Sequence, residues 1–228
     1  MRILSIDTSL GTGLLVCEAA EGSVEVLFSQ YQPDSRRHAE SLGPMLAEAL
    51  ADERVAAAAL DAVVAARGPA PFTGLRAGLV TARTVGRARR IPVHGVPSLD
   101  AVARAALDEG ADLPAGTVVR VLTDARRKEV YTAAYRARGH DDVERLSEIE
   151  VVRPSDMPRD VQVVAGSGAA LYPEAVGGLP VLAPVSGDAL TQVRLALSRL
   201  GRGQELGTEP LYLRHADVQM PTAPKRYS

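Results

Sequence analysis

The sequence predicts an α/β protein built from two units. Hydrophobic residues make up 46% of the 228-residue chain, which is enough for a sizeable core without disulfides or metal. There are no tryptophans and only two phenylalanines, so this core must consist mainly of Leu, Val and Ala side chains packed closely around a sheet. Short apolar runs alternate with segments of helical period, and the linker-like segment 109–116 divides this pattern in two.

The first unit is predicted to follow the order βββαβαβα. Three apolar runs separated by glycine-containing turns predict an antiparallel meander over residues 3–6, 14–17 and 24–28. Apolar residues then recur at helical spacing from His38 to Leu50. The remaining elements are expected to be strands at 62–66 and 91–96, a helix at about 73–89 and a helix that Ser98 caps.

The second unit is predicted to be a smaller α/β arrangement. Its strands are expected at 118–123, 130–135, 148–152 and 161–165, followed by a helix at about 189–200. We therefore predict an N-terminal domain at 1–108, a C-terminal domain at 116–214 and a polar tail at 215–228. The tail contains two prolines, so we expect an arm or disorder there.

Composition and charge exclude several classes of function. The 26 basic and 28 acidic residues give a formal charge of −2, so the chain alone has no electrostatic reason to bind nucleic acid. The single cysteine, Cys17, excludes an internal disulfide. The N-terminus lacks the apolar run of a signal peptide, and the longest apolar stretch, 55–66, contains Asp61 and is too short to span a membrane. The sequence therefore predicts a soluble, cytoplasmic protein.

One candidate ligand site lies at the end of the first strand. Asp7, Thr8 and Ser9 precede a glycine turn, so a carboxylate and two hydroxyls meet turn N–H groups there. Such a group can hold a Mg²⁺-bound phosphate, which makes these residues candidates for nucleotide binding. In the alternative interpretation, Asp7 and Ser9 only satisfy N–H groups of the turn, and the shortness of the motif favours this alternative.

A second candidate surface lies on the helix predicted at about 73–89. Small residues recur there at every fourth position and let another helix approach closely: Gly74, Gly78, Ala82 and Gly86. The approaching helix is either the one that starts at His38, within the chain, or a helix of a partner subunit. Leu79, Val80 and Val85 widen the apolar face and favour a partner.

Other motifs point to structure more than to chemistry. The four histidines lie far apart in the sequence and there is one cysteine, so a local zinc or iron site is excluded, whereas a site assembled from distant residues is not. The loop 68–76 could present N–H groups to an anion, but its two prolines favour a rigid turn. Residues 124–131 predict a charged hairpin turn with local ion pairs, and the glycines at 166 and 168 resemble a nucleotide loop only weakly.

Several motifs together resemble the bacterial TsaB proteins, also called YeaZ, which act in threonylcarbamoyladenosine synthesis on tRNA. The FTGLR stretch at 72–76 and the DARRKEVY stretch at 124–131 are specific, whereas Asp7-Thr8-Ser9 alone is not. One departure is Ala70-Pro71, where the family more often has Gly-Ser. The matching segments span nearly the whole chain in the family's order: 6–9, 38–40, 68–69, 72–76, 95–96, 98–99, 124–127, 129–131 and 210–214.

The resemblance implies two domains of the actin-like ATPase fold (ASKHA, RNase H-like), the second one reduced. It also implies an accessory subunit instead of a catalyst. The catalytic partner is a paralogue, TsaD, which transfers a threonylcarbamoyl group to the adenosine beside the tRNA anticodon. TsaD carries an HxxxH metal motif after the strand that matches 91–96. Ser98 and Val102 stand at those ligand positions here, so neither a catalytic residue nor a metal site is expected.

The resemblance further implies pairing with TsaD through two helices, here 38–50 and 73–89. A TsaE-type ATPase is expected to join the assembly, and a homodimer is expected when the chain is alone. tRNA is expected to bind only through the complex, and this chain requires no cofactor, although ATP and Mg²⁺ can act in the complex. The residues expected to contact the partner are Leu42, Met45, Leu46, Gly74, Gly78, Leu79, Ala82 and Gly86.

Two other functions stay open at this point. An ATP- and Mg²⁺-dependent phosphotransferase of the same fold would use Asp7 to hold the metal. A peptidase would need a metal or an activated nucleophile, which the sequence does not assemble. If the small-residue row faces a partner, the substitution Gly78→Leu is expected to abolish pairing and to leave the chain folded.

Overall fold

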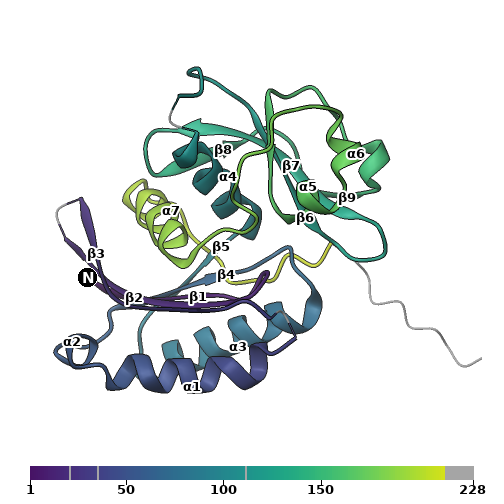
Figure 1. Cartoon of the computed structure of the whole chain (residues 1–228). Coiled ribbons are helices and arrows are strands. Elements are labelled where there is room, and N and C mark those ends of the chain that lie inside the picture. The colour runs from purple at the N-terminus through teal and green to yellow at the C-terminus, as the bar shows by residue number, and fades with distance from the viewer. Residues whose placement is uncertain (21, 35, 111, 214–228) are drawn as a thin grey trace, which may run out of the picture.

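The computed structural model describes residues 1–20, 22–34, 36–110 and 112–213. In this part of the chain two five-stranded sheets enclose a layer of two helices, and further helices cover the outer faces of the sheets (Figure 1). The predicted α/β class is confirmed. The predicted tail at 215–228 lies outside the described residues.

The first sheet is built from the predicted meander and two parallel strands. Its strand order is β3-β2-β1-β4-β5, in which β1, β2 and β3 are antiparallel and β4 and β5 run parallel to β1. This order places the end of β1 in the middle of the sheet edge, with Asp7 directly opposite Gly13 of β2. The strands are β1 (Arg2–Asp7), β2 (Thr12–Ala20), β3 (Ser23–Gln32), β4 (Ala62–Ala66) and β5 (Val93–Val96).

Three helices cover one face of this sheet: α1 (His38–Ala51), α2 (Glu53–Ala56) and α3 (Phe72–Arg89). Their apolar residues join those of β1, β2 and β4 in one buried cluster, while α1 and α3 lie side by side on the outside (Figure 1). Helix α2 was not predicted from the sequence. It is a single turn that begins where the Asp52 side chain accepts hydrogen bonds from the backbone N–H groups of Arg54 and Val55.

The second unit contains the other sheet. Its strands run in the order β10-β6-β7-β8, and β9 pairs with β7. Two short helices, α5 (Ser167–Leu171) and α6 (Pro173–Val176), and the 3₁₀ turn η1 (Pro154–Asp156) accompany it. The strands are β6 (Val119–Asp124), β7 (Val130–Arg138), β8 (Asp142–Arg145), β9 (Glu150–Val152) and β10 (Val163–Ala165).

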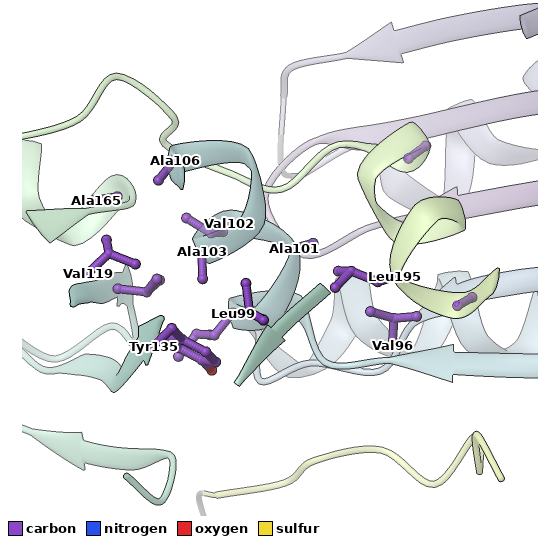
Figure 2. Close-up of a cluster of buried hydrophobic side chains, with 14 of the residues drawn as sticks. Val96, Leu99, Ala101, Val102, Ala103, Ala106, Val119, Tyr135, Ala165 and Leu195 are labelled. Carbon is purple, nitrogen blue, oxygen red and sulfur yellow. The ribbon is translucent and has the colours of Figure 1, made fainter. Parts of the chain in front are cut away.

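The helices α4 (Ser98–Glu109) and α7 (Ala189–Gly201) form the layer between the two sheets. Figure 2 shows α4 with Val119 and Tyr135 of the second sheet on one side and with Leu195 of α7 on the other. Because both sides are covered, α4 is buried almost all round and not only along the stripe that its periodicity predicts. The core is therefore continuous between the two units.

The last part of the described chain returns to the first sheet. The predicted C-terminal domain at 116–214 is thus not self-contained, because α7 packs against β1, β2, β4 and β5. The segment that follows runs beside β5, where Gly95 N donates a hydrogen bond to Leu206 O at 3.1 Å. Farther along, Leu211 N donates to Arg67 O at 2.9 Å. Both ends of the described chain therefore belong to the first sheet.

Charged side chains connect α4, α7 and the second sheet. Arg199 of α7 contacts Asp100 of α4 and Asp142 of β8, each at 2.8 Å. Arg202 also pairs with Asp142, and Arg104 donates to the backbone carbonyl of Asp142 at 3.2 Å. Burial lowers the pKa of Arg199, but the two carboxylates outweigh burial and raise it. Since Asp100 and Asp142 are buried, their charges depend on these partners.

The small-residue row of α3 faces the chain's own sheet. A Cβ atom at Gly74 would lie 2.9 Å from the carbonyl oxygen of Thr8, and one at Gly78 would overlap the Thr8 hydroxyl. A Cβ atom at Gly86 would overlap the side chain of Val93 in β5. The close approach that the row permits is therefore made within the chain, to the first sheet and, at Gly74, to His38 at the start of α1. This agrees with the within-chain alternative for the first turn of α3 and contradicts the interpretation that favoured a partner.

The apolar residues predicted to contact a partner are buried as well. Leu42, Met45, Leu79 and Ala82 are at most 5% exposed and belong to the core beneath α1 and α3. Of the eight predicted contacts only Leu46 keeps part of its surface in solvent. The outer face of this helix layer carries other residues, which include Ala39, Gly43 and Ala47 of α1 and Val80 and Thr84 of α3 as well as several exposed Glu and Arg side chains.

The glycine packing predicts that Gly78→Ala lowers the free energy of unfolding by about 1–3 kcal/mol, because the added methyl group overlaps Thr8. Gly201→Ala in α7 is the matched control, since nothing lies within 4 Å of a Cβ atom there, and its stability is expected to stay the same or rise. Urea unfolding of both variants tests this, and a Gly78→Ala variant as stable as the wild type would contradict the packing.

The buried charges predict that Arg199→Met lowers the free energy of unfolding by about 3–5 kcal/mol, because Asp100 and Asp142 each lose a partner while staying buried. The control is Arg136→Met, which breaks an ion pair to Glu144 in which both side chains are about half exposed, and no measurable change is expected. Equal unfolding midpoints for the two variants would show that Arg199 does not hold the layers together.

Candidate functional site

Two cavities meet at the end of β1, where Asp7, Thr8 and Ser9 lie. The larger one, of about 410 Å³, is bounded by the β1–β2 turn, β3 and the start of α7. The smaller one, of about 40 Å³, lies in the cleft between the two units. Asp7 lines the larger cavity, Ser9 lines both, and Thr8 lines neither. The structure therefore separates three residues that the sequence places together.

Asp7 is buried and firmly held. Its Oδ1 accepts a hydrogen bond from Ser9 N at 2.7 Å, and its Oδ2 accepts one from Gln192 Nε2 of α7 at 2.6 Å. Burial raises the pKa of Asp7 and the charge of Asp188 adds to the rise, although the hydrogen bonds from Ser9 and Gln192 oppose it. Asp7 thus satisfies a turn N–H group, as the alternative interpretation of this motif holds, and in addition faces a cavity.

Thr8 points to the opposite side of the sheet. It is 1% exposed, and its side chain packs against Gly78 of α3. Its hydroxyl has no hydrogen-bond partner among the described residues. The prediction that Thr8 contacts a nucleotide is wrong in this structure, because the hydroxyl is enclosed between β1 and α3.

The smaller cavity is the place where a nucleotide would enter a two-unit cleft. Small-molecule sites usually measure about 300 Å³ or more, whereas about 40 Å³ accommodates a few water molecules. The Oγ atoms of Ser98 and Thr123 are buried and have no hydrogen-bond partner among the described residues, so water is their natural partner. Residues of both units line this space: Ser9, His38, Pro69, Pro71, Ser98, Thr123, Asp124, Arg126, Ser167 and Ser186.

Ser98 does not cap α4, contrary to the prediction. Pro97 holds the N-cap position, and Ser98 is the first residue of the helix. The backbone N–H of Ser98 donates to the carbonyl of Gly68 at 2.8 Å, which ties the start of α4 to the loop after β4. This loop packs tightly, with Pro69 and Ala70 buried, which agrees with the rigid turn that its prolines favour.

The turn between β6 and β7 borders the same cleft. Asp124 Oδ1 accepts a hydrogen bond from Arg126 N at 2.8 Å, and the two side chains form an ion pair at 3.3 Å, as the sequence predicts for this hairpin. Arg126, Arg127 and Lys128 all have positive φ angles of 55° to 63°. Because residues other than glycine rarely adopt this conformation, the turn is strained. The turn contains no glycine, so the sequence does not indicate its positive φ angles.

The described residues contain neither a cluster of metal-ligand side chains nor a helix suited to span a membrane. Among the described residues, no group of three His, Cys, Asp or Glu side chains is placed to hold a metal ion. Val102 and Ser98, which stand where the resemblance places metal ligands in TsaD, both line the small cavity. No helix within the described ranges is long and apolar enough to cross a membrane.

A cluster outside the cleft secures the C-terminal segment to α3. The guanidinium of Arg76 lies 3.6 Å from the centre of the Phe72 ring, and the rings of Phe72 and Tyr212 are 5.1 Å apart. About two turns farther along α3, Arg83 pairs with Glu209 at 3.2 Å. Three of these residues, Phe72, Arg76 and Tyr212, fall in segments that matched the family motifs, 72–76 and 210–214. The sequence motifs gave no sign that these two segments meet.

Comparison with known proteins adds the family. The family model for TsaD, described as tRNA N6-adenosine threonylcarbamoyltransferase, matches residues 32–165. The tRNA threonylcarbamoyladenosine biosynthesis protein TsaB of Escherichia coli is 28% identical over 94% of this chain and 95% of its own length. The Bacillus subtilis TsaB protein is 32% identical over 60% of this chain and 56% of its own.

Mycobacterial relatives and a solved structure complete the comparison. An uncharacterized Mycobacterium leprae protein is 41% identical over 80% of this chain, which spans about half the length (47%) of that relative. The structure of YeaZ from Pseudomonas aeruginosa superposes with a TM-score of 0.77 at 26% identity and covers 93% of this chain and 99% of its own. The chain therefore belongs to the tRNA N6-adenosine threonylcarbamoyltransferase family and, within it, to the TsaB (YeaZ) proteins.

Proposed function

We propose that this chain is a non-catalytic accessory subunit in tRNA threonylcarbamoyladenosine synthesis, which binds and activates a TsaD-type catalytic partner. The Escherichia coli relative, which matches 94% of this chain, carries the name of that pathway, and this supports the choice of process. The match to the TsaD family model supports a partner of similar fold, because related folds often pair through equivalent surfaces.

The outer face of α1 and α3 carries the proposal. This face presents small and apolar side chains among the charged side chains of Glu40, Glu48, Arg76, Arg83 and Arg87. Val80 of α3 is 62% exposed. Ala39, Gly43 and Ala47 of α1 let a partner helix approach closely, and the neighbouring exposed Thr84 is short as well. The buried row beneath α3 supports the surface indirectly, because it fixes α3 against the sheet.

The cleft supports an accessory role over an ATP- and Mg²⁺-dependent phosphotransferase. A cavity of about 40 Å³ is far below the size of a nucleotide site, and Thr8 is turned away from it. In this account the chain contributes no catalytic residue.

Activation would act through the population of the partner's competent state. A subunit that binds one conformation more tightly than another shifts the equilibrium by its difference in binding free energy. The rigid packing of α3 favours this mechanism, because a preorganised face loses little entropy on binding. We further propose that a TsaE-type ATPase joins the complex, that tRNA binds through the complex, and that two copies of this chain pair through the same face when the partner is absent.

The proposal predicts that Ala47→Arg and Val80→Arg each abolish the complex with the TsaD-type protein of the same organism, because a long charged side chain would be forced into an apolar interface. Light scattering on a sizing column measures the loss. Threonylcarbamoyl transfer to tRNA by the partner is expected to fall in parallel.

Two substitutions on the second unit serve as matched controls. Ala170 and Leu171 of α5 are also exposed, the latter by 55%, so Ala170→Arg and Leu171→Arg introduce the same charge away from α1 and α3. Both controls should pair like the wild type. The proposal fails if the α1 and α3 variants keep full pairing, or if the controls lose it equally.

A further inference from the structure

The larger cavity has no part in the proposed function. It lies on the α7 side of the first sheet, facing away from α1 and α3, and measures about 410 Å³, which is within the range of small-molecule sites. Its walls include apolar residues of the sheet, the β1–β2 turn and α7, namely Leu10, Leu15, Val26 and Leu190. Tyr31 of β3 and Ser186 of the loop before α7 both border it.

A glycine leaves the buried carboxylate open to this cavity. Gly13 lies in β2 directly opposite Asp7, and its φ angle is not positive, so its backbone conformation suits any residue. A Cβ atom there would make only ordinary contacts, the nearest at 3.8 Å to Asp7 and Tyr31. Glycine inside a strand weakens it and commonly marks a place where a ligand approaches closely. The fold therefore does not need a glycine at this position, which borders the cavity beside Asp7.

The charges around the cavity have one sign. Asp7 and Asp188 line it, and none of its lining residues in the described chain is Lys, Arg or His. Burial raises the pKa of Asp7, and the charge of Asp188 raises it further. Burial also raises the pKa of Tyr31, and the charge of Asp7 adds to that rise. The cavity is thus a largely apolar space that two carboxyl groups line, with no basic side chain among its lining residues in the described chain.

We propose that this cavity binds a small organic amine, whose protonated nitrogen pairs with Asp7 and Asp188 and whose apolar body lies against Leu15, Val26 and Leu190. A carboxylate oxygen has two lone pairs, so each oxygen of Asp7 can accept one more hydrogen bond beside those from Ser9 and Gln192. An anion would meet two carboxylates with no compensating cation. A bare metal ion would lack a third protein ligand among the described residues and would leave the apolar walls uncovered.

Two probes that differ only in the head group test the charge requirement. Calorimetric titration at neutral pH compares 2-phenylethylamine with 2-phenylethanol. The amine is expected to bind at least tenfold more tightly than the alcohol, and the difference should shrink as salt is added. Equal affinities, or no binding of the amine at millimolar concentration, would overturn the proposal.

Substitutions then locate the site. Asp7→Asn should remove the preference for the amine, and it is expected to fold because it removes a charge that burial disfavours and because the free Oε1 of Gln192 can accept from the new amide. Asp188→Asn should weaken the preference while keeping the helix cap, since asparagine caps as well as aspartate does.

Gly13→Leu fills the floor of the cavity and should abolish binding of both probes, whereas Gly201→Leu, at a glycine with open space around it, should bind like the wild type. Thermal melting checks that each variant is folded. Amine binding that survives in both Asp7→Asn and Gly13→Leu would place the site elsewhere and refute the assignment.

Discussion

The contact of Arg199 with two buried carboxylates is the interaction on which the rest of the structure depends. Asp100 lies on α4 and Asp142 on β8, so the guanidinium of Arg199 joins the two helices of the central layer to each other and to the second sheet. Neither carboxylate is tolerable inside the protein without a counter-charge. The two helices of the central layer, and with them the two sheets, are thereby held in one arrangement.

This arrangement determines what each surface of the molecule can do. Helix α4 of the central layer lines the cleft, whose volume is about 40 Å³, and the start of α7, through Asp188, Ala189 and Leu190, forms one wall of the larger cavity beside Asp7. The opposite face of the first sheet carries α1 and α3, whose outer sides lie at the surface except where Phe72, Arg76 and Arg83 contact the segment 208–212 (Figure 1). The proposed binding face and the small cleft are therefore both positioned by the packing of the helices on the first sheet.

Much of the fold could be predicted from the sequence, because hydrophobic period and turn residues are local signals. The meander, most of the strands and helices and the hairpin at 124–131 follow from them, whereas α2 and β8 were not predicted. The burial of α4 on all sides could not be predicted in this way, since Asp100 and Arg104 look like surface residues until their partners from distant segments are known. The return of α7 to the first sheet is a long-range event of the same kind.

The candidate site shows the same limit. Asp7 was identifiable as the end of a strand, but its separation from Thr8 depends on which side of the sheet each side chain occupies. The row of Gly74, Gly78 and Gly86 correctly indicated close packing, yet a spacing of four residues cannot tell a partner from the chain's own sheet. The role of Gly13 could not be predicted from the sequence, because it depends on the space around this residue, which only the structure gives.

The most direct test of the proposed pairing face uses the chemistry of the chain's only cysteine. Cys17 is fully buried and burial raises its pKa to about 11, so it should not react with a maleimide at neutral pH. Alkylation of an Ala47→Cys variant can then be timed with and without the TsaD-type partner, with Ala170→Cys as the reference. The account predicts that the partner slows alkylation at position 47 at least tenfold and leaves position 170 unchanged. Unchanged alkylation at position 47 in a complex that has formed would contradict it.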